Sequence, residues 1–75
     1  MEFKWEDGFE ITVRITDGAA VISANREGLL SLSSILRTLA DGKAGDHVHL
    51  DPYNSLEEGS AELILEKSGE PSSEE

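Results

Sequence analysis

Alternation of apolar and polar residues predicts strands in the first third of the chain. In Phe9–Thr16 four apolar side chains fall on one face of an extended strand and four polar ones on the other. Glu2–Glu6 alternates in the same way, and Ala19–Ala24 is a more apolar run. The pairs Asp7-Gly8 and Asp17-Gly18 separate these runs, and Asp-Gly favours a two-residue hairpin turn because both positions need positive φ. The pattern predicts a three-stranded antiparallel meander.

The apolar period then becomes helical. Four leucines between Leu29 and Leu39 recur at the spacing of one helix face. Asn25 suits the N-cap, where its side chain accepts a first-turn backbone N–H. Gly42 suits the left-handed residue that often follows a helix. One helix is therefore predicted between Asn25 and Gly42.

Two further strands are predicted at Asp46–Leu50 and Ala61–Lys67. Asp51–Ser60 joins them as a loop that is long for a hairpin, and long loops in small domains are often functional. The order β-β-β-α-β-β predicts one α+β domain over residues 1–67. In this two-layer fold, one helix packs on one face of an antiparallel sheet.

The second face of such a sheet stays exposed, because a single helix covers only one side. This face is polar enough to remain wet and is a natural platform for a partner or a second copy of the chain. The predicted registers line it with Lys4, Thr12, Arg14, His47, His49, Glu62, Ile64 and Glu66.

Composition narrows the class of protein. The 75 residues include no cysteine, which excludes a disulfide framework and a thiolate metal site. Sixteen acidic residues against six basic ones give a net charge of -10, which disfavours binding to nucleic acid or anionic lipid. The charge is explained either by a solvated surface or by a partner with a basic surface.

Location and the ends of the chain follow from the same composition. No apolar run approaches the ~20 residues of a membrane span, and the acidic N-terminus has no apolar signal core. We therefore expect a cytoplasmic protein. The last eight residues, 68–75 (SGEPSSEE), have no apolar residue and are expected to form a disordered acidic tail.

His47, His49 and Asp51 are the one set that resembles a metal site. Alternation places them on one strand face, and imidazole with carboxylate suits Zn²⁺ or Fe²⁺. However, Asp51 precedes Pro52 and is suited to start a turn by accepting the backbone N–H groups that follow it. A solvated strand face is the favoured interpretation and metal binding the alternative. We expect no metal and no cofactor.

The loop after Asp51 suggests binding rather than catalysis. The chain has no glycine-rich phosphate loop and no cysteine nucleophile, and no histidine accompanies the serines of the helix. Glu57 and Glu58 are adjacent in an exposed loop, unlike a catalytic carboxylate pair in a cleft. With Tyr53 as an aromatic anchor they form a candidate partner-binding loop, with His49 and Asp51 at its margin. A simply solvated loop is the alternative.

Three motifs stand out in two segments of the chain, Ile22–Ala40 and His47–Lys67. They are N-R-E-G-L at Asn25–Leu29, H-x-H-L-D at His47–Asp51 and N-S-L-E-x-G-S-x-E-L at Asn54–Leu63. With these motifs the two segments resemble the small bacterial proteins of the Immunity protein 32 family. The resemblance covers a little over half of the chain and identifies no catalytic residue.

The resemblance implies a small cytoplasmic protein that neutralises a cognate bacterial toxin by direct binding. Met1–Lys67 carries 13 acids and 6 bases, a net of -7, which suits a basic, nuclease-like toxin. Two alternatives remain. One is a non-enzymatic homodimeric α+β domain of unknown role that pairs through its open sheet face, and the other is a metal-dependent module built on the histidines.

Overall fold

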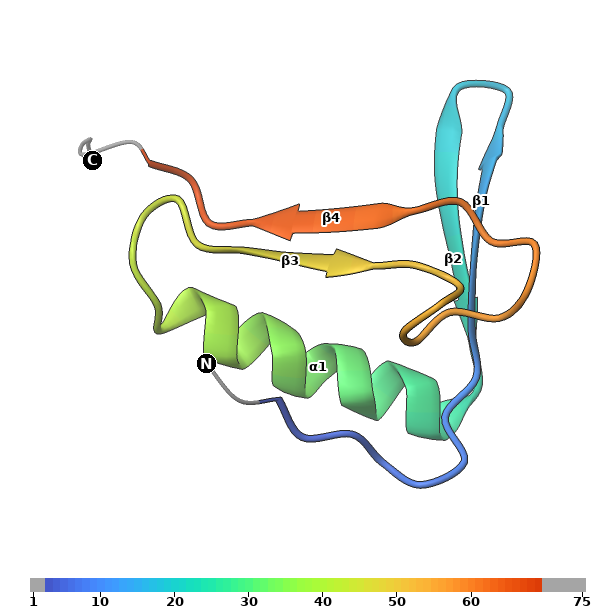
Figure 1. Cartoon of the computed structure of the whole chain (residues 1–75), viewed down its shortest axis with the longest axis horizontal. Helices are drawn as coiled ribbons and strands as arrows, with labels where there is room; N and C mark the ends of the chain where they lie inside the picture. The colour runs from blue at the N-terminus through green and yellow to red at the C-terminus, as the bar shows by residue number, and fades with distance from the viewer. Residues whose placement is uncertain (1–2, 70–75) are drawn as a thin grey trace.

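The computed structural model describes residues 3–69, which form one helix and four strands (Figure 1). The elements are β1 (Ile11–Thr16), β2 (Ala19–Ala24), α1 (Arg26–Ala40), β3 (His47–Leu50) and β4 (Leu63–Glu66). The predicted α+β class is confirmed. The strands, however, form two separate antiparallel hairpins, β1-β2 and β3-β4, in place of one five-stranded sheet.

The prediction of a first strand at Glu2–Glu6 is wrong for residues 3–6, the part of it that the structure describes. Residues 3–6 pair with no strand, and Glu2 lies outside the described residues. The Glu6 backbone N–H instead donates to the hydroxyl of Ser31 on α1 at 2.8 Å, and the Trp5 ring packs on Phe9 with centroids 4.7 Å apart. The alternation of apolar and polar residues in this segment therefore does not mark a strand. It arises because Phe3, Trp5 and Phe9 pack against the core.

The β1-β2 hairpin follows its turn chemistry. Asp17 and Gly18 both have positive φ, at 52° and 79°, as a two-residue turn of this type requires. Only the base of the hairpin is buried: Val13 is 1% exposed, whereas Ile15, two residues further along the same face, is 64% exposed. The far end of the hairpin projects beyond the rest of the molecule (Figure 1).

Helix α1 begins where the sequence predicts. Asn25 is the N-cap, and its Oδ1 accepts the Gly28 N–H at 2.7 Å. The same oxygen accepts the Glu10 N–H at 3.0 Å, while Asn25 Nδ2 donates to the Gly8 carbonyl at 3.0 Å. The cap therefore also attaches the segment before β1 to the start of the helix.

The C-terminal end of α1 differs from the prediction for Gly42. Asp41 is the C-cap, and Gly42 is not among the glycines with positive φ. A Cβ at Gly42 would lie 2.6 Å from Asp46 Oδ2, the movable end of a side chain, and 3.2 Å from the Leu39 carbonyl oxygen, so the space around Gly42 requires only a small adjustment. The helix end is instead closed by Lys67, whose Nζ donates to the carbonyls of Ala40 and Gly42 at 2.7 Å each. This cation lies at the negative end of the helix dipole.

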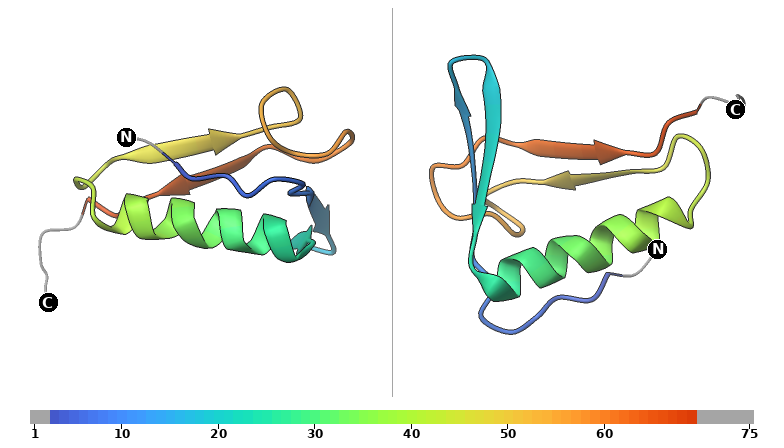
Figure 2. Two further views of the ribbon diagram at one scale, coloured as in Figure 1. Left: turned by 90° about the horizontal axis from the view of Figure 1, so that it is seen from below. Right: turned by 180° about the vertical axis from the view of Figure 1, so that it is seen from behind.

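The β3-β4 hairpin covers the helix with one face (Figures 1 and 2). Val48 and Leu50 point into the core, and the alternating residues His47 and His49 point outward and are exposed. The buried core comprises Ile11, Val13, Leu32, Ile35, Leu39, Val48, Leu50 and Leu56.

The loop between β3 and β4 explains why a single sheet does not form. Its Glu57 N–H donates to the Ile11 carbonyl at 2.8 Å, and its Ala61 N–H donates to the Val13 carbonyl at 2.8 Å. The Val13 N–H is satisfied by the hydroxyl of Ser60 at 3.1 Å. Because the loop occupies this edge of β1, no third strand pairs there. The expected polar platform is accordingly divided: Thr12 and Arg14 lie on a different sheet from the histidines.

Candidate partner-binding surface

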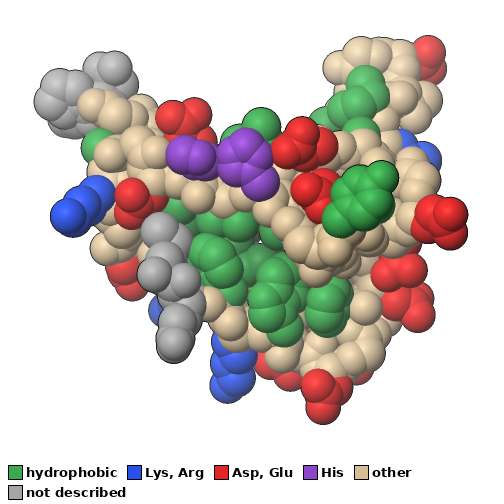
Figure 3. Space-filling model, viewed as in Figure 1, with side chains coloured by type: hydrophobic (Ala, Val, Ile, Leu, Met, Phe, Trp, Pro, Cys, Tyr) green, Lys and Arg blue, Asp and Glu red, His purple; other side chains and the backbone are tan. Residues whose placement is uncertain are grey.

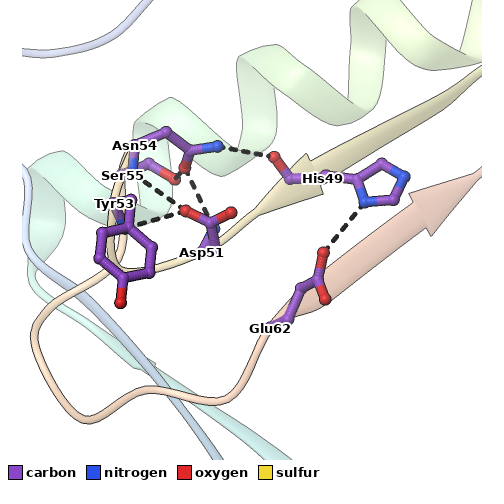
Figure 4. A network of polar contacts seen from close by, with 6 residues as sticks. All are labelled: His49, Asp51, Tyr53, Asn54, Ser55 and Glu62. Carbon is purple, nitrogen blue, oxygen red and sulfur yellow. Dashed lines mark hydrogen bonds and ion pairs between the residues drawn. The ribbon is translucent and has the colours of Figure 1, made fainter.

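Asp51 starts the loop that carries most of the predicted contact residues (Figure 4). Its Oδ1 accepts the N–H groups of Tyr53 at 2.9 Å and Asn54 at 3.1 Å. Its carbonyl accepts the N–H groups of Asn54, Ser55 and Leu56 at 2.9 to 3.1 Å. The turn predicted at Asp51 is confirmed, and the Asp51 carboxylate stabilises it by accepting backbone N–H groups of its own loop.

Asn54 closes the same turn from the other side. Its Oδ1 accepts the Asp51 N–H at 3.1 Å, and its Nδ2 donates to the His49 carbonyl at 3.1 Å (Figure 4). Leu56, which is 5% exposed, anchors the loop in the core. The loop is thus attached to β3, to β1 and to the core, and it presents its remaining side chains from a fixed backbone.

Tyr53 is the most exposed large hydrophobic residue of the described chain, with 98% of its surface accessible. Its N–H bonds to Asp51, while its ring stands outside the hydrogen-bonded network (Figure 4). Tyr53 and Glu58 border the same open hollow of about 550 Å³, together with Pro52, Gly59 and Ser60. The structure therefore brings the predicted aromatic anchor and one of the two loop acids together.

Glu57 and Glu58 do not act as a pair. Glu57 borders a different shallow depression, whose lining includes Glu10, Thr12 and Asn25 at the base of the β1-β2 hairpin. The division arises because the Glu57 N–H is bonded to β1, which fixes the direction of the chain at this point. Of these two acids, Glu58 is the one that borders the hollow beside Tyr53.

The outward face of the β3-β4 hairpin adjoins the loop. His49 Nδ1 lies 3.0 Å from Glu62 Oε2, and both side chains are about half exposed, at 50% and 52%. The rings of His47 and His49 approach edge-on with centroids 5.0 Å apart. Ile64 lies opposite His49 in the register and is 53% exposed. Figure 3 shows the histidine side chains flanked by acidic ones on this face.

The predicted metal alternative loses its third ligand in this geometry. Asp51 Oδ1 is engaged by the loop backbone, and His49 Nδ1 by Glu62. Among residues 3–69, no three side chains of histidine, cysteine, aspartate or glutamate come together in a way that could hold a metal ion.

In the same part of the chain, no helix has the length and apolar character needed to cross a membrane.

The sequence predicts Tyr53, Glu58, His49 and Asp51 near this surface, and the structure adds Glu62, Ile64 and Asn54 to it. Strand alternation had placed Glu62 and Ile64 on the open face, and this signal was sufficient to find them. The local sequence does not predict the role of Asn54, because its bond to the His49 carbonyl depends on how the loop folds back.

The fold and this surface define a small α+β domain that displays an exposed tyrosine and acidic side chains on a hydrogen-bonded loop. A protein-family model, Immunity protein 32, matches residues 20–68, about two thirds of the chain. The chain belongs to this family, as its motifs predicted. The match runs from β2 through β4 and includes the whole loop. A search of curated proteins and a search of solved structures each return no match.

Proposed function

We propose that this immunity-family protein neutralises a cognate toxin by binding it directly through the Asp51–Ser60 loop and the adjoining outward face of β3-β4. Family membership supports an immunity role. The contact residues that we propose are Tyr53, Glu57, Glu58, His49 and Asp51.

Tyr53 is the observation that carries this proposal. A fully exposed aromatic ring contributes nothing to the core, yet its backbone is fixed by the Asp51 carboxylate. A tyrosine held in this way can bury a large apolar area on binding with little loss of conformational entropy. Tyrosine is also enriched among the residues that dominate binding energy at interfaces.

Charge supports a basic, nuclease-like toxin as the partner. The chain has a net charge of -10, and Glu58 lies beside Tyr53 while Glu62 lies beside His49. An acidic surface accelerates association with a basic partner and disfavours wrong partners. Such a surface also imitates the charge of a nucleic acid substrate, which it would exclude from the toxin.

The remaining contact residues have distinct roles in this proposal. Asp51 holds the Tyr53 backbone and contributes its charge at the margin of the contact. His49, half exposed and paired with Glu62, supplies a polar contact beside the loop. Glu57 borders the depression near β1 and extends the contact to that side.

Binding alone accounts for immunity in this proposal, without catalysis, metal or cofactor. The proposed acids lie in exposed loop positions, with Glu57 and Glu58 bordering different hollows. We place the protein in the cytoplasm as a single domain over residues 1–67. Residues 70–75 of the predicted acidic tail lie outside the described residues, while Ser68 and Gly69 are exposed and outside any strand.

An affinity capture from lysate of the source cells tests the proposal. The tagged protein is the bait, and bound proteins are identified after washes of rising salt. We expect one basic protein that is released only at high salt and whose gene is toxic when expressed alone. Co-expression of the present chain should then restore growth. Absence of a stoichiometric partner, or a partner without toxicity, would contradict the immunity role.

Variants locate the contact surface. The triple substitution Tyr53→Ala, Glu57→Lys and Glu58→Lys should abolish protection while the circular dichroism spectrum stays unchanged, since all three side chains are exposed. For charge alone, Glu58→Lys is compared with Asp41→Lys, the same charge change at the exposed C-cap of α1. Protection by the folded triple variant would place the contact surface elsewhere.

A further inference from the structure

The free edge of β2 is the strand edge best suited to self-association. Each of the four strands has one outer edge, because each sheet has only two strands. The edges of β1, β2 and β3 differ in whether other groups already bond to them. The loop satisfies the outer groups of β1 at Ile11 and Val13, and Asn54 Nδ2 occupies the His49 carbonyl on β3. Within residues 3–69, the hydrogen bonds that hold the loop, the helix cap and Lys67 reach none of the outer groups of β2.

The hairpin turn fixes which β2 groups point outward. Thr16 and Ala19 flank the two-residue turn and form a hydrogen-bonded pair, so alternation makes Arg14 with Val21 the next such pair. The backbone N–H and C=O of Ala20 and Ile22 therefore face away from β1. The same parity turns Val13 toward the loop, where its bonds to Ser60 and Ala61 are observed.

β2 also lacks the features that normally protect an edge. Residues 19–25 contain no charged residue and no proline, and β2 has no bulge in its pairing with β1. Its apolar face is incompletely covered, because Ile22 is 41% exposed and Ile15, on the same face of the hairpin, is 64% exposed. The far end of the hairpin projects with its apolar face unpacked, and a two-stranded ribbon is marginally stable alone, so a further strand would stabilise it.

We propose that two copies of this chain dimerise by antiparallel pairing of β2 with β2 about a twofold axis at Ile22. This register pairs Ile22 with the partner's Ile22, and Ala20 with the partner's Ala24, and it joins the two hairpins into one four-stranded sheet. Uncharged residues meet uncharged residues, which matters for two chains that each carry a net charge of -10.

The outer edge of β4 illustrates the importance of charge. The same antiparallel pairing about Ile64 would place Glu62 opposite the partner's Glu66, and like charges directly opposite are destabilising. β2 and α1 lie on the near side when the molecule is viewed from behind, whereas the histidine face is seen from the front (Figures 2 and 3). The dimer thus leaves Tyr53, Glu58 and the histidine face open, whereas the depression that Glu57 borders includes Ser23 and Ala24 of β2 and lies beside the dimer interface. The dimer proposal does not depend on the toxin proposal.

Sedimentation of the purified protein tests the dimer without any toxin. The mass of the wild type should rise with concentration to twice the 8.1 kDa of one chain. Ile22→Lys should remain a monomer at every concentration, because two lysines would meet at the axis. Ile64→Lys, the same substitution on the exposed face of β4, should still dimerise.

Three results would overturn the proposal: a monomeric wild type at all concentrations, a dimeric Ile22→Lys variant, or loss of the dimer only in Ile64→Lys. Amide exchange of the wild type gives a second readout that needs no variant. The Ile22 and Ala20 amides should exchange more slowly at high protein concentration, and exchange that does not depend on concentration would reject the β2 edge as the interface.

Discussion

At the scale of single residues, two positions at the start of α1 hold the fold together. Asn25 bonds to the helix, to Glu10 and to Gly8, so one amide side chain joins the start of the helix to the segment before β1. Gly28 allows the first turn of the helix to approach the chain before β1. Sequence predicted the N-cap from residue type, but the two additional bonds of Asn25 depend on tertiary structure.

Asn25→Ala should lower the free energy of unfolding by about 1–2 kcal/mol, since it removes an N-cap and two further bonds, to the Glu10 N–H and the Gly8 carbonyl. Asn25→Asp should lose less, because an aspartate still accepts the Gly28 and Glu10 N–H groups and lacks only the donor to Gly8. Urea denaturation measures both variants. Equal stability of Asn25→Ala and the wild type would show that these bonds contribute nothing.

Gly28→Ala should destabilise the protein, although alanine is favoured over glycine inside helices by about 1 kcal/mol. The added Cβ would lie 2.6 Å from the Glu10 carbonyl oxygen and 2.9 Å from the Ala24 Cβ, so backbone must move. We expect a loss of about 1–3 kcal/mol in thermal or urea unfolding. Ser33→Ala, at an exposed position of the same helix, is the control and should be neutral or slightly stabilising. A stabilised Gly28→Ala variant would contradict the close approach.

At the scale of elements, the loop between β3 and β4 lies along the edge of β1 where the sequence predicted a strand at residues 2–6. The alternation in residues 2–6 is indistinguishable from that of a strand, but Ser31 offers the Glu6 N–H a buried acceptor and the apolar side chains dock on the core. The loop meanwhile occupies β1 through Glu57, Ser60 and Ala61. A local sequence pattern cannot predict these contacts between residues far apart in the chain. In contrast, β1, β2 and α1 were predictable from turn chemistry, alternation and capping.

Asn54→Ala should loosen this loop with little effect on the core. It removes the acceptor for the Asp51 N–H and the donor to the His49 carbonyl. We expect faster hydrogen exchange of the Tyr53 and Asn54 amides and a loss of global stability of about 1 kcal/mol. Ser55→Ala, which removes a hydroxyl that donates to Asn54 Oδ1, is the milder control. Unchanged exchange in Asn54→Ala would show that Asn54 does not hold the loop.

At the scale of the whole molecule, a buried core supports two proposed binding surfaces. One is the Asp51–Ser60 loop with the outward face of β3-β4, and the other is the free edge of β2. The family match covers residues 20–68, so the first 19 residues, including β1 and the segment docked on Ser31, lie outside it. The candidate site was predictable as far as loop length and residue type allowed: Tyr53 and Glu58 do come together. The separation of Glu57 from Glu58 was not, because it follows from the bond between Glu57 and β1.

The affinity of the captured toxin for the wild type and for Tyr53→Ala, measured by titration calorimetry, tests the central claim most directly. If the exposed ring of Tyr53 anchors the complex, the dissociation constant should rise by at least about tenfold in Tyr53→Ala, as expected for a residue that dominates an interface. Ile64→Ala, with a 53% exposed side chain on the adjoining face, should change it less. Equal affinities of Tyr53→Ala and the wild type would show that the loop is not the toxin-binding surface.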